Sequence, residues 1–421
     1  MLERSKCMNV PEIRFKEFCD YYSDVLLEKC LSVSNKKNNK LEYKKEDALS
    51  VSDEFGVVNQ IEHLGRSYTG NNISTYKILN KGQIVYTKSP LKLKPFGIIK
   101  VNNNKPGIVS VLYAIYDVKE GFEPNYISVY FEPNFRLNRY LLPLINKGAK
   151  NTINISDETA LSGEVHIPLS YAEQQKIASY FQSLDSLIQS TSKKLVSLKQ
   201  VKAASLQSMF PQEGETVPKV RFKGFEGEWE KEKLCNIASR ITRKNKNLES
   251  FTPLTISAID GLVSQLTYFN NIVASSNISG YYLIKNGEFA YNKSYSNGFP
   301  YGSIKRLDKF DMGVLSTLYI VFALNKQNTS ILSDYLVIFF NTTLWHHEIA
   351  KRAEEGARNH GLLNISAEDF LDINIIYPKD LLEQQKIASY FRNLDKQISL
   401  QTQRLEKLKQ IKAACLDKMF V

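Results

Sequence analysis

The chain has 421 residues, of which 43% are hydrophobic and 24% charged, and its formal net charge is +11. This length accommodates two or three soluble globular domains, and no apolar run approaches the roughly 20 residues that cross a bilayer. We therefore expect a cytoplasmic protein without a membrane segment, whose positive charge modestly favours a polyanionic partner.

A short motif near the N-terminus occurs again in the middle of the chain. It reads VPEIRFKEF from Val10 and VPKVRFKGF from Val217. Further matched pairs follow in the same order: NKGQIVYTKS and KNGEFAYNKS, PFGIIK and PYGSIK, GIVSVLY and GVLSTLY, GAKN and GARN. A repeat this long predicts two tandem domains of one fold rather than a solenoid of short units.

Each half shows the same order of predicted elements. Residues from about 50 to 115 and from about 255 to 325 form short runs rich in β-branched and aromatic residues, which indicates strands. The last third of each half is more helical, as in 333–352, and is followed by a Gly/Asn loop and a short strand (Glu164 to Pro168; Asp372 to Pro378). This mixture predicts an α+β fold for each half.

The most regular stretch of each half is its end, Glu173 to Phe210 and Glu383 to Phe420, where both copies begin EQQKIASYF. Neither copy contains Gly or Pro, and apolar residues recur in alternating steps of four and three, interrupted at Thr191 and Gln401. This spacing predicts one long amphipathic helix per half, whose apolar stripe needs a partner, and the other copy is the obvious candidate. The predicted seam residues are Ile177, Phe181, Leu184, Ile188, Leu195, Leu198, Ile387, Phe391, Leu394, Ile398, Leu405 and Leu408.

These patterns predict five segments along the chain. They are a first globular domain (1–170), a first helix (171–210), a linker rich in Pro, Gly and Glu (211–216), a second globular domain (217–380) and a second helix (381–421).

The sequence carries no recognisable catalytic set. It has no P-loop, no G-x-G-x-x-G after a strand, no N-P-P-[YF] or D-P-P-[YF] tetrapeptide and no H-E-x-x-H. Its five cysteines are widely spaced without C-x-x-C, and the neighbours His346 and His347 would point apart. We predict no catalytic residue, no cofactor and no metal site in this chain.

Basic and polar residues recur in loops at matching places of the two halves. Lys and Arg can neutralise phosphates, and Arg and Asn can also bond to base edges. Solvated surface loops would explain any one of these residues, but they do not predict matched placement. The candidate DNA-contact residues are Lys36, Lys37, Lys88, Ser89, Lys94, Lys150, Asn151, Arg243, Lys244, Lys293, Ser294, Lys305, Arg306, Arg358 and Asn359.

The combination of motifs resembles the specificity subunit of type I restriction-modification enzymes. It consists of E-Q-Q-K-I-A-S-Y-F-x-x-L-D, a heptad helix ending near K-A-A-x-L-x-x-M-F, and V-P-x-x-R-F-x-x-F one domain earlier. The likeness covers essentially the whole chain. It is closer in the second half, where YNKSYSNGFPYGSIKR and EGARNHGLLNIS resemble a target-recognition domain of that family.

The resemblance implies that DNA recognition and catalysis belong to different subunits. Each globular domain would read one half of a bipartite target in double-stranded DNA, and the two helices would pair as an antiparallel coiled coil that sets the spacer. Two methyltransferase subunits would pack on this frame and hold S-adenosylmethionine, and restriction subunits would supply the chemistry of ATP and magnesium. The chain itself would be a non-catalytic subunit.

Three other interpretations stay open at this stage. A stand-alone DNA-binding or regulatory protein would need the same loops and no catalytic partner. A scaffold built on the coiled coil would not bind DNA at all. A nuclease or methyltransferase would require a motif that the sequence does not show.

Overall fold

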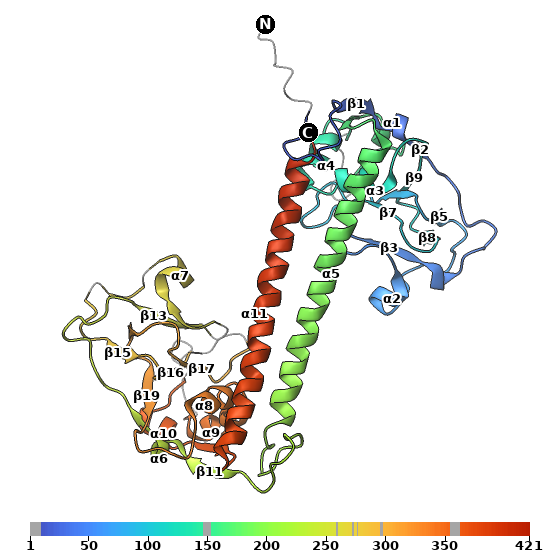
Figure 1. Ribbon diagram of the computed structural model, residues 1–421. Coiled ribbons are helices and arrows are strands. Elements are labelled where there is room, and N and C mark those ends of the chain that lie inside the picture. The colour runs from blue at the N-terminus through green and yellow to red at the C-terminus, as the bar shows by residue number, and fades with distance from the viewer. Residues whose placement is uncertain are drawn as a thin grey trace. The chain divides into compact units, whose positions relative to one another are not determined.

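The computed structural model describes residues 10–145, 153–257, 260–271, 273–275, 277–294, 298–353 and 363–421. The chain divides into two compact units, Met1–Lys193 with Gln403–Val421, and Lys194–Thr402. We call them unit 1 and unit 2 and describe each by itself. Both contain a segment of each long helix, α5 (Tyr171–Ser208) and α11 (Leu381–Lys418), as Figure 1 shows.

Unit 1 is built on a four-stranded antiparallel sheet in the order β2-β9-β6-β7. Its strands are β2 (Leu31–Val33), β9 (Ala114–Val118), β6 (Ile84–Tyr86) and β7 (Ile99–Val101). Three antiparallel pairs surround it: β1 (Ser23–Leu26) with β10 (Glu164–Ile167), β3 (Leu49–Ser52) with β4 (Gly56–Asn59), and β5 (Lys77–Leu79) with β8 (Gly107–Val109). The short helices are α1 (Leu27–Cys30), α2 (Gln60–Leu64), α3 (Pro124–Tyr130) and α4 (Asn134–Leu141).

Unit 2 repeats this topology in the order β12-β19-β16-β17. Its sheet strands are β12 (Ala238–Arg240), β19 (Ile320–Leu324), β16 (Phe289–Asn292) and β17 (Ser303–Arg306). The pairs are β11 (Glu230–Lys233) with β20 (Asn374–Tyr377), β13 (Leu254–Ser257) with β14 (Gly261–Ser264), and β15 (Tyr282–Lys285) with β18 (Met312–Leu315). The helices are α6 (Leu234–Ile237), α7 (Gln265–Phe269), α8 (Ser333–Phe339), α9 (Leu344–Arg352) and α10 (Ala367–Leu371). The predicted α+β class and the duplication are therefore confirmed.

A short helix interrupts the predicted strand region of each unit. Helices α2 and α7 follow β4 and β14 directly, at a place where the sequence analysis expected only strands. Asn59 caps α2 by accepting hydrogen bonds from the backbone N–H groups of Ile61 and Glu62 at 2.9 and 3.1 Å. This local capping favours a helical turn over a longer strand.

Apolar burial joins the bodies of the units to the helix segments. In unit 1, the side chains of Ile84, Tyr86 and Tyr116 belong to a buried cluster that also contains Phe181 and Phe420. In unit 2, the corresponding cluster contains Phe210 and Phe391, whose ring centroids lie 6.2 Å apart. The amphipathic stripe of each helix is therefore buried partly against the sheet and helices of a globular body.

Within each unit, the start of one long helix packs against the end of the other. In unit 1, Lys412 Nζ lies 2.6 Å from Asp185 Oδ1, and Tyr180 Oη lies 3.4 Å from Cys415 Sγ. The pattern recurs in unit 2, where Lys202 contacts Asp395 at 2.5 Å and Ser205 contacts Tyr390 at 3.0 Å.

These contacts make the helix segments antiparallel inside each unit. Ile177, Phe181, Leu184, Leu195 and their counterparts Ile387, Phe391, Leu394 and Leu405 are buried, whereas Ile188, Leu198, Ile398 and Leu408 are half-buried. Pairing of the two helices over their full length stays a prediction.

Candidate nucleic-acid interface

The two recurring sequence motifs meet in space in each unit. We call residues 10–18 and 217–225 the clamp segments. Arg14 forms a bidentate ion pair with Glu173 in the first turn of α5, with both N–O distances 2.7 Å. Arg221 does the same with Glu383 in the first turn of α11, again at 2.7 Å. Two planar parallel hydrogen bonds fix the direction of a side chain as well as its position.

Each clamp segment also bonds to the end of the other long helix. The backbone N–H of Ile13 donates to the carbonyl oxygen of Lys418 at 2.9 Å, and that of Val220 donates to the carbonyl oxygen of Ser208 at 2.9 Å. Carbonyl groups in the last turn of a helix have no partner within the helix. The clamp segments therefore satisfy helix ends and join the body of each unit to both helix segments.

The glutamine after each of these glutamates is also part of the frame. Gln174 accepts a hydrogen bond from the backbone N–H of Glu123 at 2.9 Å and donates to the carbonyl oxygen of Pro168 at 2.8 Å. Gln384 accepts from the N–H of Leu332 at 2.8 Å and donates to the carbonyl oxygen of Pro378 at 2.9 Å. The repetition of this glutamine is visible in the sequence, but its bonding partners are not.

The loop that follows β6 or β16 carries several of the predicted contact residues and turns tightly at one glycine. Gly302 has a φ of +77°, and a Cβ atom there would lie 2.0 Å from the carbonyl oxygen of Asn292. Gly97 has a φ of +78°, and a Cβ atom there would lie 2.8 Å from Thr87 Oγ1. The repeated P-[FY]-G therefore reflects a backbone position that only glycine occupies without strain.

This loop is tied to the segment that precedes β10 or β20. In unit 1, Lys88 Nζ donates to Asp157 at 2.5 Å. In unit 2, Lys293 Nζ donates to the carbonyl oxygen of Ile365 at 3.1 Å, and the backbone N–H of Leu363 donates to the carbonyl oxygen of Lys293 at 3.0 Å. Two stretches that are far apart in sequence therefore form one neighbourhood in each unit.

The basic loops after β2 and β12 are each held by a buried asparagine. Asn38 donates to the carbonyl oxygen of Tyr43 at 2.8 Å and accepts from the N–H of the same residue at 3.1 Å. Asn245 makes the same pair of bonds with Ser250 at 2.8 and 3.2 Å. The two asparagines stand at matched positions in the sequence, but only their basic neighbours were predicted to contact DNA.

The predicted contact residues differ in how free their side chains are. Lys36 and Lys37 are exposed and Ser89 is half-buried. Lys244 lies over the ring of Tyr282, with Nζ 3.9 Å from the centroid, and the backbone N–H of Ser294 bonds to Asn292. Lys150, Asn151, Arg358 and Asn359 lie outside the described residues.

Four other predicted contact residues are paired inside their units. Lys94 Nζ donates to the carbonyl oxygen of Glu132 at 2.7 Å and lies 3.3 Å from Asp53. Arg243 pairs with Glu288 at 2.7 Å. Burial lowers the pKa of Lys305 to about 8. Arg306 pairs with Asp308 at 2.6 Å and with Asp334 at 2.8 Å. Their role in DNA contact stays a prediction.

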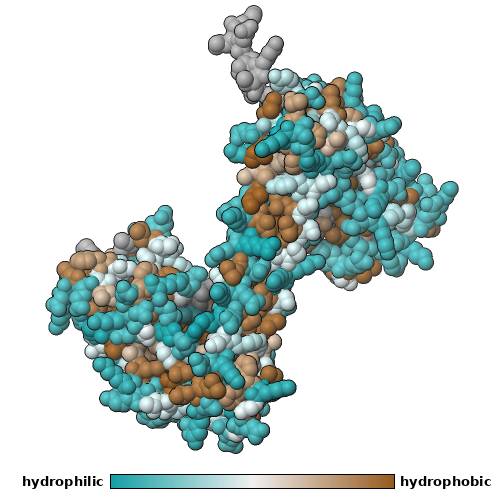
Figure 2. Space-filling view, in the orientation of Figure 1, coloured by the Kyte–Doolittle hydropathy of each residue, from teal (hydrophilic) through white to brown (hydrophobic). Residues whose placement is uncertain are grey.

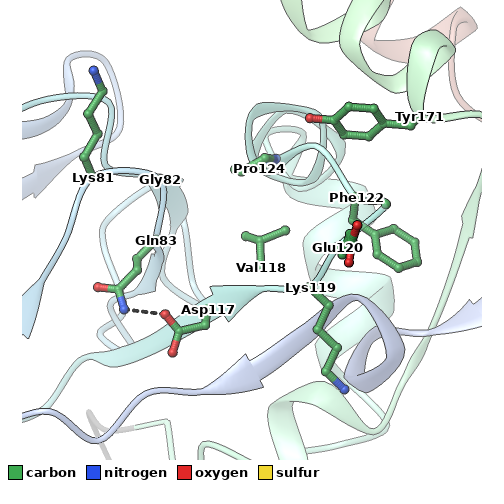
Figure 3. A pocket seen from close by; sticks show the side chains of 11 residues that line it. Lys81, Gly82, Gln83, Asp117, Val118, Lys119, Glu120, Phe122, Pro124 and Tyr171 are labelled. Carbon is green, nitrogen blue, oxygen red and sulfur yellow. Dashed lines mark hydrogen bonds between the residues drawn. The ribbon is translucent and has the colours of Figure 1, made fainter.

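A hollow of about 680 Å³ lies elsewhere in unit 1, between the turn before β6, the loop after β9 and the first residue of α5 (Figure 3). Gln83 donates a hydrogen bond to Asp117 on one side of it, whereas the ammonium groups of Lys81 and Lys119 point away. None of the predicted contact residues lines this hollow. On the face shown in Figure 2, hydrophilic side chains cover much of each unit and hydrophobic patches are scattered among them.

The described part of the chain contains no cluster of three or more His, Cys, Asp or Glu side chains that could hold a metal ion. Across the same residues, no helix combines the length and the apolar character that crossing a membrane requires.

Comparison with known proteins agrees with this architecture. Residues 269–410 match the family model "Type I restriction modification DNA specificity domain". The structure is similar to that of the type I restriction-modification system S subunit from M. genitalium, with a TM-score of 0.61 and 12% identity, over 98% of this chain and 99% of that one. It is also similar to the HsdS subunit from Thermoanaerobacter tengcongensis, with a TM-score of 0.43 and 13% identity, over 95% and 96% of the two chains. No curated protein sequence matches the chain.

The fold is therefore that of a type I specificity subunit, an assignment that rests on the first of these structures and covers nearly the whole chain. The family-model match agrees with this fold over residues 269–410. The resemblance inferred from the repeated motifs is confirmed.

Proposed function

We propose that this chain is the sequence-specific DNA-recognition subunit of a type I restriction-modification complex. Each unit would read one half of a bipartite target, and the long helices would set the spacer and seat two methyltransferase subunits. Restriction subunits would complete the assembly. S-adenosylmethionine, ATP and magnesium would be bound by the partners, and this chain would contribute no catalytic group.

The observation that carries this proposal is the pair of equivalent loop neighbourhoods on equivalent frames. Each frame is fixed by the same Arg–Glu and Gln contacts, whereas the loops that it presents differ in sequence. A shared frame with different loops is the arrangement expected for two domains that do one job on two different half-sites. The net charge of +11 favours a polyanion as the common ligand.

Methylome sequencing of the native cell, with the gene present and deleted, tests the proposal. We expect one split adenine-methylated motif to appear and vanish with the gene. Purification of the full chain from that cell should also recover a methyltransferase subunit. A methylome that does not change, together with specific duplex binding by the chain alone, would instead indicate a stand-alone DNA-binding or regulatory protein.

The role of the helices as a spacer has its own test. Insertion of one heptad after Ser190 should lengthen the unread spacer of the methylated motif and leave both half-sites unchanged. Altered half-sites would contradict a spacer role.

A further inference from the structure

Two lysine ammonium groups in unit 1 converge on a single carboxylate. Lys77 Nζ lies 2.9 Å from Asp157 Oδ2, and Lys88 Nζ lies 2.5 Å from Asp157 Oδ1. The three side chains are 11%, 19% and 13% exposed, so the cluster is mostly buried but not sealed from solvent. Two cations around one anion leave one positive charge that no group within the cluster balances.

The backbone at this cluster has an anchor that does not involve the carboxylate. The hydroxyl of Tyr116, which is buried in β9, donates to the carbonyl oxygen of Asp157 at 3.2 Å. The Asp157 side chain, in contrast, is bonded to the two lysines alone among the contacts of the described residues. Rotation of this side chain would therefore free both ammonium groups without movement of the main chain.

The conformation of Lys88 marks the same place. Its φ of +49° lies in the left-handed region, which is uncommon for a residue with a side chain and is enriched at functional sites. Lys88 also lies two residues after the end of β6, at the start of the loop that carries the predicted contact residues Ser89 and Lys94.

We propose that Lys77 and Lys88 form a binding site for a backbone phosphate of duplex DNA, and that Asp157 occupies this site until DNA displaces it. The two carboxylate oxygens, each bound by one lysine, stand where the two non-bridging oxygens of a phosphodiester would lie. This inference rests on the proposed function. It adds that the protein's own Asp157 carboxylate competes with a DNA phosphate for the two lysines. Burial opposes ionisation of Asp157, but hydrogen bonds from Lys88 and Lys77 lower its pKa, so the competitor stays charged at neutral pH.

Unit 2 is built differently at the matched positions. Lys293 stands where unit 1 has Lys88, and it donates to the uncharged carbonyl oxygen of Ile365. Tyr282 stands where unit 1 has Lys77, and Ala367 follows N-I-S where unit 1 has Asp157. Lys293 therefore keeps its full charge for a ligand, and the competition is a property of unit 1.

The test compares Asp157→Asn with Glu120→Gln in the full chain. Both changes remove one negative charge, but Glu120 is exposed in the loop that borders the hollow of Figure 3, away from the lysine pair. Affinity for a duplex is measured as a function of salt. We expect Asp157→Asn to bind about fivefold more tightly, the upper range for a partly exposed ion pair, with a salt slope steeper by about one phosphate. Glu120→Gln should leave the slope unchanged.

Two further variants keep the test decisive if Asp157→Asn is unstable. Asp157→Glu keeps the charge and should bind as the wild type does, and Lys88→Gln should reduce the wild-type slope by about one phosphate. Equal slopes for Asp157→Asn and Glu120→Gln, or an unchanged slope for Lys88→Gln, would overturn the inference while wild-type binding still supports the proposed function. Absence of duplex binding by the wild type would overturn the proposed function itself.

The last control replaces the duplex with inorganic phosphate at matched ionic strength. If it raises the melting temperature of Asp157→Asn as much as the duplex does, the lysine pair binds a free anion and the inference fails.

Discussion

Units 1 and 2 share a frame and differ in how that frame holds its loops. In both, an arginine of the clamp segment is bonded bidentately to a glutamate that begins a long helix. Beyond this frame, Lys88 is held by a carboxylate in unit 1, whereas its counterpart Lys293 is held by a backbone carbonyl in unit 2. The contrast teaches that the residues that meet the helix ends are duplicated, whereas the lysine that follows β6 or β16 has a different anchor in each unit.

The largest effect is expected from breaking the frame. Arg221→Ala leaves the carboxylate of Glu383, which is 0% exposed, without its bidentate partner, and an uncompensated buried charge costs about 3–5 kcal/mol. Arg14→Ala should cost less, because the hydroxyl of Tyr22 also lies 3.4 Å from Glu173. Hydrogen exchange of each unit measures the two losses separately.

The control for this prediction is Arg221→Lys, which keeps the charge but loses the second parallel bond and should be intermediate. A loss of stability below about 1 kcal/mol for Arg221→Ala would show that the frame does not depend on this pair.

A smaller effect is expected at the loop glycines. Gly302→Ala places a Cβ atom against the carbonyl oxygen of Asn292, whereas Gly97→Ala meets the hydroxyl of Thr87 first, and that hydroxyl can rotate. We expect Gly302→Ala to destabilise unit 2 by about 2 kcal/mol and Gly97→Ala to destabilise unit 1 by about 1 kcal/mol. Thermal unfolding measures both.

Gly298→Ala is the matched control for the glycines. Its φ of +81° imposes the same backbone strain, but a Cβ atom there meets nothing within 4 Å. If Gly298→Ala and Gly302→Ala are equally destabilising, conformation alone explains the glycine and the close approach to Asn292 is irrelevant.

An effect of the opposite sign is expected from a lysine that both units bury at the same place. Lys305 donates to Asn341, and burial lowers its pKa to about 8, below its ordinary value of 10.5. Between these two pH values the unfolded chain binds more protons than the folded one, so the stability of the wild type rises with pH across that window. Lys305→Met should therefore be more stable than the wild type at pH 7, by no more than about 3 kcal/mol, and this advantage should shrink towards pH 10.5.

Lys100 provides the comparison in unit 1. Burial also lowers its pKa, but Glu132 and Asp53 act in the opposite direction. Lys100→Met should gain less at pH 7 because it removes a partner of Asp53. Chemical denaturation between pH 7 and 10.5 checks both variants, and an equal gain in the two units would show that the acidic neighbours have no effect.

Much of the fold could be predicted from the repeats. The matched motifs indicated two equivalent α+β bodies, and the heptad steps indicated long helices whose stripe at Phe181 and Phe391 is indeed buried. Helices α2 and α7 were missed because they are five residues each, too short to show helical periodicity.

The candidate site was harder to predict. Loop composition drew attention to Lys305 and Arg306, yet burial and ion pairs occupy both side chains. It also passed over Asp157 and Lys77, because the residues of an ion cluster come from distant strands and loops and leave no spacing in the sequence.

The sequence by itself determined that this protein is a duplicated chain with two long amphipathic helices, because hydrophobic period and repeated motifs are local properties that survive without coordinates. Only the tertiary structure shows the physical reason for the repetition of the motifs. VPxxRFxxF and EQQ lie far apart in the chain, and they meet because Arg14 and Arg221 neutralise buried glutamates at helix starts. The tertiary structure also decided which lysines are already paired, because burial and distance, rather than residue type, determine whether a charge is free for a ligand.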